Sequence, residues 1–193
     1  MRQLGARPPR DRALLDAISA IEPRQFEGSL WRAVRVGTDP LRATRAGGRW
    51  DDGTFDVLYT STQQDGALAE SWYHHSAGQP IPPSRNIARQ IHRLRATIDT
   101  VLYLSKDDLV GLGIVMSGYG RLSYVERKAE YPTTQQIGEM AFFLEYQAIV
   151  VPGARWPASN AVILAEHTRP GQITVESSSD VDLSAWHRTG KSS

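Results

Sequence analysis

Apolar side chains recur along this chain with two spacings, one typical of helices and one typical of strands. Near the N-terminus they repeat every three or four positions, at Ala13, Leu14, Ala17, Ile18 and Ile21. That spacing predicts an amphipathic helix, and Pro23 is expected to end it. Because this helix precedes the segments with chemical character, we interpret residues 1–27 as an N-terminal helical extension that packs or docks a partner.

The segment SLWRAVRVG, residues 29–37, alternates with a period of two and predicts a strand. Leu30, Val34 and Val36 share one side of this strand with Arg32. A guanidinium among apolar side chains is costly unless an anion meets it. Arg32 is therefore a candidate for binding an anionic ligand.

A glycine- and aspartate-rich connection, residues 37–55, leads to a buried strand over residues 56–62 and then to a helix in QDGALAESWYHHS, residues 64–76. Asp65 is expected to cap this helix, and Gly78 with Pro80 to close it. Three- and four-residue spacing places one stripe of side chains together, namely Gly66, Ala67, Glu70, Tyr73 and His74. Two very small residues beside Glu70 would let a ligand or another backbone approach closely.

The remaining pattern predicts more strands than helices. A proline-rich loop, residues 79–86, precedes a long strand or a strand pair over residues 91–105, and a short helix over residues 106–114. A helix is expected from Thr133 or Thr134, followed by two apolar strands, residues 146–153 and 160–167, an edge strand over 172–183 and a loose tail over 187–193. We predict a single α+β domain over residues 1–193, with a mixed β-sheet core and flanking helices.

Composition excludes several classes of protein. The 193 residues are 40% hydrophobic, as in a globular domain, and the formal charge of +1 gives no support to direct nucleic-acid or membrane binding. The absence of cysteine excludes disulfides, thiolate zinc sites and a cysteine nucleophile. No apolar run is long enough to cross a bilayer and no signal-peptide core is present, so a cytoplasmic protein is expected.

The common catalytic and ligand-binding motifs are also missing. There is no phosphate loop, no G-x-G-x-x-G, no H-E-x-x-H and no G-x-S-x-G. His74 and His75 are adjacent, and a helix turns them about 100 degrees apart, which is poor geometry for chelation. We expect no metal site.

Four residues remain as a candidate site. Arg32, Arg49, Tyr59 and Glu70 fall on or beside a predicted strand-to-helix corner, where they could converge. Arginine grips a diphosphate with two parallel hydrogen bonds, and a tyrosine ring stacks on a base. A carboxylate stabilises the positive charge that grows on a ribose as its glycosidic bond breaks. These groups would suit the binding and cleavage of a dinucleotide.

Each residue also has a structural interpretation. Arg49 could pair with one of the nearby aspartates, Asp51, Asp52 or Asp56, on a solvated loop. Tyr59 could be an ordinary sheet residue, and Glu70 a surface carboxylate of a helix. Taken singly, each of these interpretations is favoured.

The order of the motifs along the chain favours a functional interpretation of these residues over a structural one. LWRAVR, GGRWDDG, VLYTST and ALAE follow one another at compatible distances, and TQQIGEMAFFLEYQAIVVPGARWPASNAVIL follows downstream. Together they resemble the RES-domain toxins of bacterial type II toxin–antitoxin pairs, from about Leu30 to Leu164. The family's named arginine and glutamate match Arg49 and Glu70, while Gly153 stands where the family has its serine. Tyr59 and Arg32 match the family's tyrosine and early-strand arginine, and Asp51 replaces its asparagine.

The resemblance implies a fold similar to ADP-ribosyltransferases and an enzyme that consumes NAD as substrate, without a metal. Glu70, Arg49 and Tyr59 would be catalytic, and Arg32, Arg49 and Tyr59 would bind NAD. The nicotinamide–ribose bond would be cleaved, and ADP-ribose would pass to water, to phosphate or to a host metabolic protein such as phosphoribosyl pyrophosphate synthetase. The implied partner is an Xre/ParS-type antitoxin that occludes the active site. The alternative is a catalytically silent binding module that lost its activity with the change at Gly153.

Overall fold

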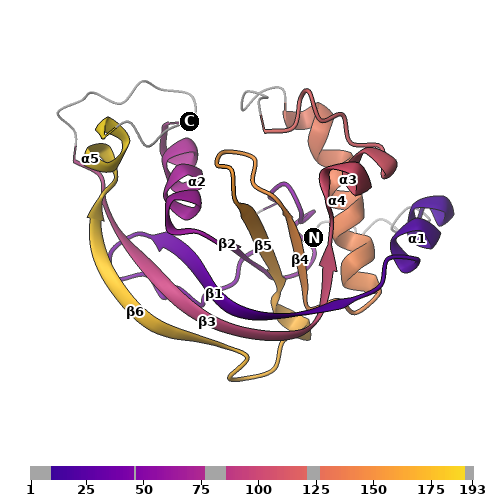
Figure 1. Cartoon of the computed structure of the whole chain (residues 1–193), viewed down its shortest axis with the longest axis horizontal. Helices are drawn as coiled ribbons and strands as arrows, with labels where there is room; N and C mark the ends of the chain where they lie inside the picture. The colour runs from indigo at the N-terminus through magenta and orange to yellow at the C-terminus, as the bar shows by residue number, and fades with distance from the viewer. Residues whose placement is uncertain (1–9, 46, 77–85, 121–126, 190–193) are drawn as a thin grey trace, which may run out of the picture.

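Six strands form one sheet in the computed structural model, which describes residues 10–45, 47–76, 86–120 and 127–189 (Figure 1). The strands are β1 Arg24–Val34, β2 Val57–Ser61, β3 Ala88–Tyr103, β4 Ala148–Pro152, β5 Ser159–Leu164 and β6 Ile173–Asp182. The helices are α1 Arg12–Ser19, α2 Gln64–Ser76, α3 Lys106–Gly111, α4 Arg127–Phe143 and α5 Leu183–Arg188, with a 3₁₀ turn, η1 Ala165–His167. The predicted α+β class is confirmed.

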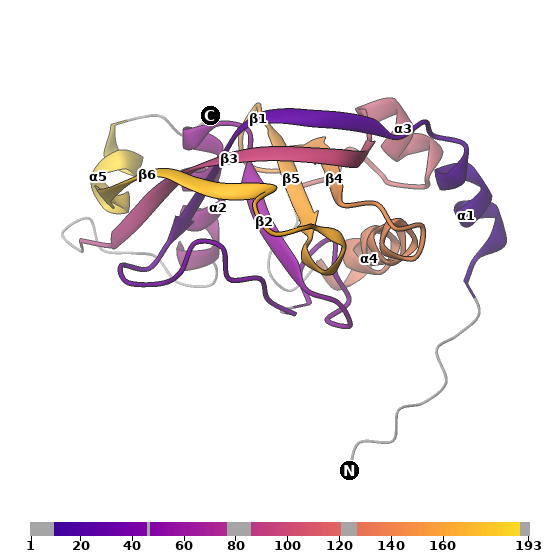
Figure 2. The same cartoon turned by 90° about the horizontal axis from the view of Figure 1, so that it is seen from below.

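The sheet closes on itself. Its strand order is β1-β2-β5-β4-β3-β6, and β1 pairs with β3 as well, so the first five strands form a ring and β6 is added at the edge. The β3–β4 pair is parallel and the other pairs are antiparallel, which makes the sheet mixed. Seen from below, β1 and β3 run together across the shorter β2, β4 and β5 (Figure 2). Such closure leaves few exposed strand edges.

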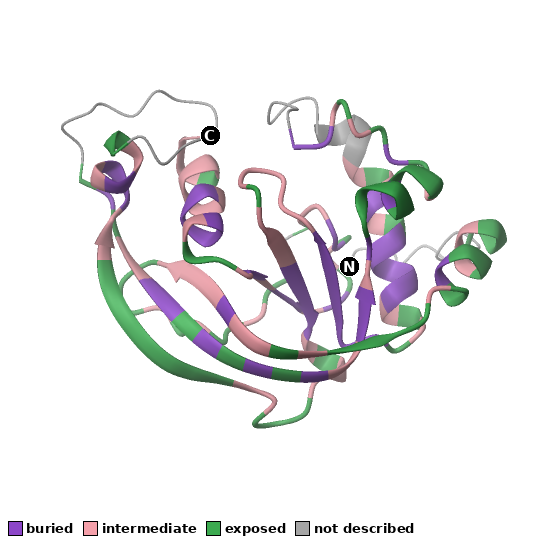
Figure 3. Ribbon diagram, in the orientation of Figure 1, coloured by how far each residue is buried: buried purple, intermediate pink, exposed green. Residues whose placement is uncertain are grey.

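Apolar side chains fill the inside of the ring, and β3 shows the alternation that places its own apolar residues there. On β3, Leu94, Ala96 and Ile98 are buried, while Arg95 and Thr97 between them are exposed, as the banding in Figure 3 shows. The core inside the ring is made by residues of five strands: Leu30, Leu58, Leu94, Ala96, Ile98, Val101, Ala148, Val150, Ala161 and Ile163. A strand that has one buried face holds its register, because a shift of one residue would expose every apolar side chain.

Helices cover the ring on two sides. A second apolar cluster joins β2, β4 and β5 to α1, α3 and α4, with Ile18, Leu109 and Met140 among its buried residues. A third cluster joins α2 and α5 to β1 and β3, through residues such as Leu68 and Ile91. The two groups of helices stand apart on either side of the shorter strands in Figure 1.

The chain pattern predicted most elements but placed several ends differently. β1 begins at Arg24, inside the segment 1–27 predicted as an extension, and α5 includes the first two residues of the predicted tail 187–193. α4 begins at Arg127 instead of Thr133 or Thr134, so it contains Pro132, a residue that removes one backbone hydrogen bond from a helix interior. Asp65 lies within the first turn of α2, and its carboxylate accepts a hydrogen bond from Nε1 of Trp186 at 2.8 Å.

Some predictions fall outside the described residues. They concern the helix end at Gly78 and Pro80, nearly all of the proline-rich loop 79–86, and residues 190–193 of the tail. In the part of the chain that the structure describes, no helix is both long enough and apolar enough to cross a membrane.

Candidate functional site

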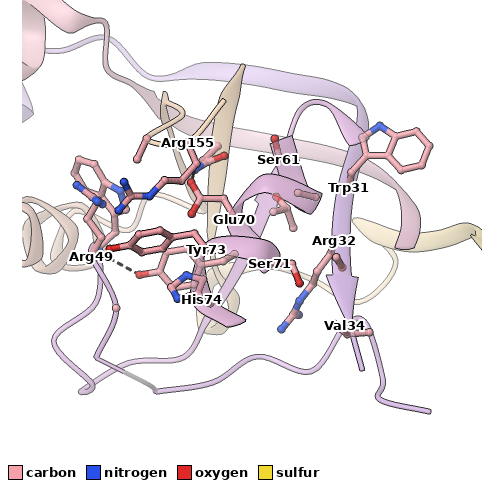
Figure 4. Close-up of a pocket in the computed structure, with 18 of the residues that line it drawn as sticks. Trp31, Arg32, Val34, Arg49, Ser61, Glu70, Ser71, Tyr73, His74 and Arg155 are labelled. Carbon is pink, nitrogen blue, oxygen red and sulfur yellow. Dashed lines mark hydrogen bonds between the residues drawn. The ribbon is translucent and has the colours of Figure 1, made fainter. Parts of the chain in front are cut away.

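A cavity of about 460 Å³ opens where β1, β2 and α2 meet the loop that precedes β2 (Figure 4). Arg32, Arg49, Tyr59 and Glu70 all line it. The four residues predicted as a site from the sequence therefore surround one hollow, although they are spread over some forty positions of the chain. Had these side chains been dispersed over separate surfaces, an ordinary structural role would have been favoured for each of them.

Helix α2 supplies one wall of the cavity. The predicted stripe of Ala67, Glu70, Tyr73 and His74 faces the hollow. Gly66 does not line the cavity; instead, it allows α2 to begin close against β2. A Cβ atom at this position would lie 2.3 Å from Oγ of Ser61, which is shorter than any stable contact.

Glu70 is oriented by the sheet. Its Oε1 atom accepts a hydrogen bond from Nδ2 of Asn160 at 2.9 Å. Asn160 belongs to β5 and is paired in register with Ser61 of β2, so its amide is fixed by backbone pairing on both strands. The carboxylate is thus held in place by a neutral donor, and no cation neutralises it in this contact.

The loop before β2 is folded around a buried carboxylate. Asp51 is fully buried, and it accepts hydrogen bonds from the backbone N–H groups of Gly47 at 2.8 Å, Gly48 at 2.8 Å and Gly53 at 3.2 Å. The hydroxyl of Tyr59 also donates to Asp51, at 2.8 Å. A Cβ atom at Gly48 would lie 2.5 Å from Oη of Tyr59, so this position requires glycine. Asp51 therefore organises the loop that holds Arg49.

The phenol of Tyr59 is fully engaged in this network. Its oxygen accepts from the backbone N–H of Trp50 at 3.0 Å while its hydrogen is donated to Asp51. Burial, together with the negative charge of Asp51, raises the pKa of Tyr59 well above its usual value. The hydroxyl stays protonated and supports the loop, and the ring lines the cavity.

Helix α4 supports the same loop from behind. Nε2 of Gln135 donates to the backbone carbonyl of Gly48 at 2.8 Å. Gly138 lies directly against the loop, because a Cβ atom there would be 2.0 Å from the carbonyl oxygen of Trp50. This contact was not predicted, although a glycine in the middle of a helix is a signal of such a close approach.

Arg49 extends from the loop between two aromatic rings. Its guanidinium carbon lies 4.9 Å from the ring centre of Tyr119 and 5.5 Å from that of Tyr131. These are cation–π distances, and such contacts hold an arginine without neutralising its charge. Tyr119 is itself fixed by a hydrogen bond from its hydroxyl to the carbonyl of Pro152 at 2.8 Å.

Arg32 is bound differently from the prediction. Its Nη1 atom donates to the backbone carbonyls of Pro40 at 2.8 Å and Arg42 at 3.0 Å, so two neutral acceptors meet the half-buried guanidinium where an anion was expected. Burial lowers the pKa of Arg32 to about 10, against the opposing effect of Asp39. The group therefore remains a cation at neutral pH and contributes positive charge to the cavity.

Asn160 and Arg155 are among the polar residues of the site that were not predicted. Asn160 stands at the start of an apolar strand, and Arg155 lies in the connection between β4 and β5. Neither position carries a periodic signal. Among the described residues, no three histidine, aspartate or glutamate side chains gather as ligands for a metal ion.

Comparison with known proteins agrees with this architecture. The family model described as the RES domain matches residues 29–185. The chain belongs to the RES-domain family. That match confirms the resemblance drawn from the order of the motifs.

Among solved structures, the RES-domain chain is similar to one in the crystal structure of the M. tuberculosis MbcT–MbcA toxin–antitoxin complex. The two chains are 22% identical, with a TM-score of 0.74 over 92% of this chain and 97% of the other. The fold is therefore shared along almost the whole length of both. No curated protein matches this sequence.

Proposed function

We propose that this chain is the toxin of a toxin–antitoxin pair and that it cleaves NAD at the bond between nicotinamide and ribose. The observation on which the proposal rests is the gathering of Arg32, Arg49, Tyr59 and Glu70 around one cavity. Membership of the RES-domain family and the likeness to a toxin from a toxin–antitoxin complex support it. The proposed place of action is the cytoplasm, where NAD is abundant.

Glu70 would stabilise the reacting ribose. As the glycosidic bond lengthens, positive charge develops on the ribose ring, and a fixed carboxylate nearby lowers the energy of that state. Asn160 would keep the carboxylate in position without cancelling its charge. Nicotinamide leaves as a neutral molecule from a cationic precursor, so this step needs neither a metal nor a general acid.

The arginines would bind the diphosphate of NAD. Arg49, held between two tyrosine rings, presents its guanidinium to the cavity, and Arg32 adds charge from β1. The ring of Tyr59 would contact the nicotinamide end, while its hydroxyl supports the loop. Binding energy from the diphosphate would thereby position the ribose against Glu70.

The ADP-ribose would then pass to a protein acceptor of the host's metabolism, such as phosphoribosyl pyrophosphate synthetase, or to water or phosphate. Isotope-labelled NAD incubated with cell lysate separates these products. Label on a discrete protein band identifies transfer, and free ADP-ribose identifies hydrolysis. The proposed partner is an antitoxin of the Xre/ParS type that covers the cavity, so NAD should bind the free toxin and not the complex.

Nicotinamide release from NAD tests the proposed reaction. We expect release by the wild-type chain and a loss of at least a hundredfold in Glu70→Gln, which removes the charge and keeps the shape. The matched control is Glu27→Gln, an exposed glutamate of β1 that pairs with Arg95 and should retain full activity. Absence of release by the wild-type chain would refute the reaction in favour of a silent binding module, which the change at Gly153 suggests as the alternative.

A further inference from the structure

A third arginine reaches the cavity from a part of the chain that the proposed reaction has not used. Arg155 lies between β4 and β5 and lines the same hollow as Arg49 and Glu70. Its guanidinium carbon is 3.4 Å from the ring centre of Tyr73, on the cavity-facing stripe of α2. Its Nε atom is buried and has no hydrogen-bond partner in the described part of the chain.

A buried donor without an acceptor is unfavourable in a folded protein. An N–H group removed from water costs about 1–3 kcal/mol when nothing accepts its hydrogen. An anionic ligand in the cavity would supply that acceptor. The stacking on Tyr73 fixes the plane of the guanidinium, so that its donors are already oriented when the ligand arrives.

The turn that presents Arg155 depends on Gly153. The backbone N–H of Gly153 donates to the carbonyl of Ala158 at 2.6 Å, and the N–H of Ala158 donates to the carbonyl of Trp156 at 2.7 Å. A Cβ atom at Gly153 would lie 2.6 Å from the first of these oxygens and 2.7 Å from the second. A serine at this position therefore does not fit the turn. This chain has a glycine where the resemblance gives a serine, and it has the guanidinium of Arg155 two residues later.

We propose that Arg155 binds the diphosphate of the dinucleotide together with Arg49. In Figure 4 these two side chains lie on one side of Glu70, and Arg32 lies on the other. Two planar guanidinium groups on one side suit a diphosphate, whose oxygens accept parallel pairs of hydrogen bonds. The inference rests on the proposed function, because it names the part of the substrate that this residue binds.

Binding of ADP tests the inference without any turnover. ADP carries the diphosphate and adenosine lacks it, so calorimetric titration of both ligands isolates the contribution of the charged group. We expect Arg155→Gln to weaken ADP binding by about ten- to a hundredfold and to leave adenosine binding within twofold of the wild type. Arg155→Lys, which keeps the charge but loses the planar fork, should fall between the two.

Controls separate ligand binding from structural support. Arg95→Gln removes an exposed arginine of β3 that pairs with Glu27, and it should bind ADP as the wild type does. Arg155→Gln should stay folded and unfold only about 2–4 °C below the wild type, because it removes the stacking on Tyr73 but no hydrogen bond of Nε. Equal ADP binding by Arg155→Gln and the wild type, equal losses for ADP and adenosine, or no ADP binding by the wild type would each overturn the inference.

The two proposals fail in different ways. If ADP binding depends on Arg155 while the wild-type chain releases no nicotinamide from NAD, the inference stands and the reaction is wrong. If Glu70→Gln abolishes nicotinamide release while Arg155→Gln binds ADP like the wild type, the reaction stands and the inference is wrong.

Discussion

The hydroxyl of Tyr59 donates a hydrogen bond to Oδ2 of Asp51 at 2.8 Å, and this contact joins the strand β2 to the loop that holds Arg49. Asp51 also accepts three backbone N–H groups of that loop. The position of Arg49 is therefore set by a buried carboxylate two residues later and by a phenol ten residues later. A residue predicted to be catalytic has a hydroxyl with a structural role.

Tyr59→Phe should accordingly destabilise the protein. The substitution keeps the ring in the cavity and removes one donor to buried Asp51 and one acceptor for Trp50, so we expect a loss of about 1–3 kcal/mol in the free energy of unfolding. Denaturant unfolding measures it. Tyr103→Phe is the matched control: Arg24 lies over its ring, a contact that phenylalanine keeps, and the change should stay within about 0.5 kcal/mol. Equal stability of the two variants would contradict the structural role of Tyr59.

Asn160→Ala should slow nicotinamide release more than it weakens NAD binding. The amide of Asn160 orients the carboxylate of Glu70 and lines the cavity at its side. Without it the carboxylate can rotate, and we expect kcat to fall by about tenfold while KM changes little. Steady-state kinetics measures both constants, and Asn86→Ala, an exposed asparagine before β3, is the control. A rise in KM with unchanged kcat would assign Asn160 to substrate binding instead.

A serine at Gly153, the residue that the resemblance gives at this position, should destabilise this protein. The new side chain would meet the carbonyl oxygens of Trp156 and Ala158, so the turn must shift, and we expect Gly153→Ser to lower the free energy of unfolding by about 1–3 kcal/mol. Gly111→Ser places the same side chain in open space and should cost little. Thermal unfolding of both variants provides the comparison. Full stability of Gly153→Ser would mean that the turn does not depend on glycine.

The stability of the fold should fall in mild acid through His92. Burial, and then the charge of Arg32, lower the pKa of His92 below its usual 6.5, and its Nδ1 atom contacts Oγ of Ser178 at 2.7 Å. As the pH falls below about 6.5, the unfolded chain takes up a proton at this residue that the folded chain resists, so stability decreases. Above that pH both states are neutral at His92 and the effect disappears.

His92→Gln should remove part of this pH dependence. We expect the difference in unfolding free energy between pH 7.5 and pH 5.5 to be smaller in the variant than in the wild type. The chain has five histidines, so other residues contribute to the total slope, and only the difference between the two proteins reports on His92. Identical slopes would show that His92 titrates normally.

Much of the site could be predicted because local pattern and motif order coincide there. The alternation in β1 placed Arg32 beside Leu30, and the small residues of α2 indicated a helix face that something approaches. The hydrogen-bond acceptors of Arg32 could not be predicted from the alternation of polar and apolar residues. The carbonyls of Pro40 and Arg42 reach it only because the following loop folds back on β1, and no periodicity records that.

The site residues that were not predicted escaped prediction for one physical reason. Asn160 is positioned by its pairing with β2, a strand about one hundred residues earlier, and Arg155 is positioned by a turn with two short backbone contacts. Tertiary pairing of this kind leaves no local signal in a single sequence. The closure of the ring through β1 and β3 was hidden for the same reason.

The two ladders that β1 forms in the closed ring differ greatly in length. Along β3, β1 is paired from Arg24 to Val34, whereas in the described residues its ladder with β2 consists of the single pair Trp31 and Ser61, both of which border the cavity. The β1–β2 junction is therefore held by far fewer backbone pairs than the β1–β3 ladder. Local opening of the ring should accordingly begin at this junction, so amide exchange there should be faster than along the β1–β3 ladder.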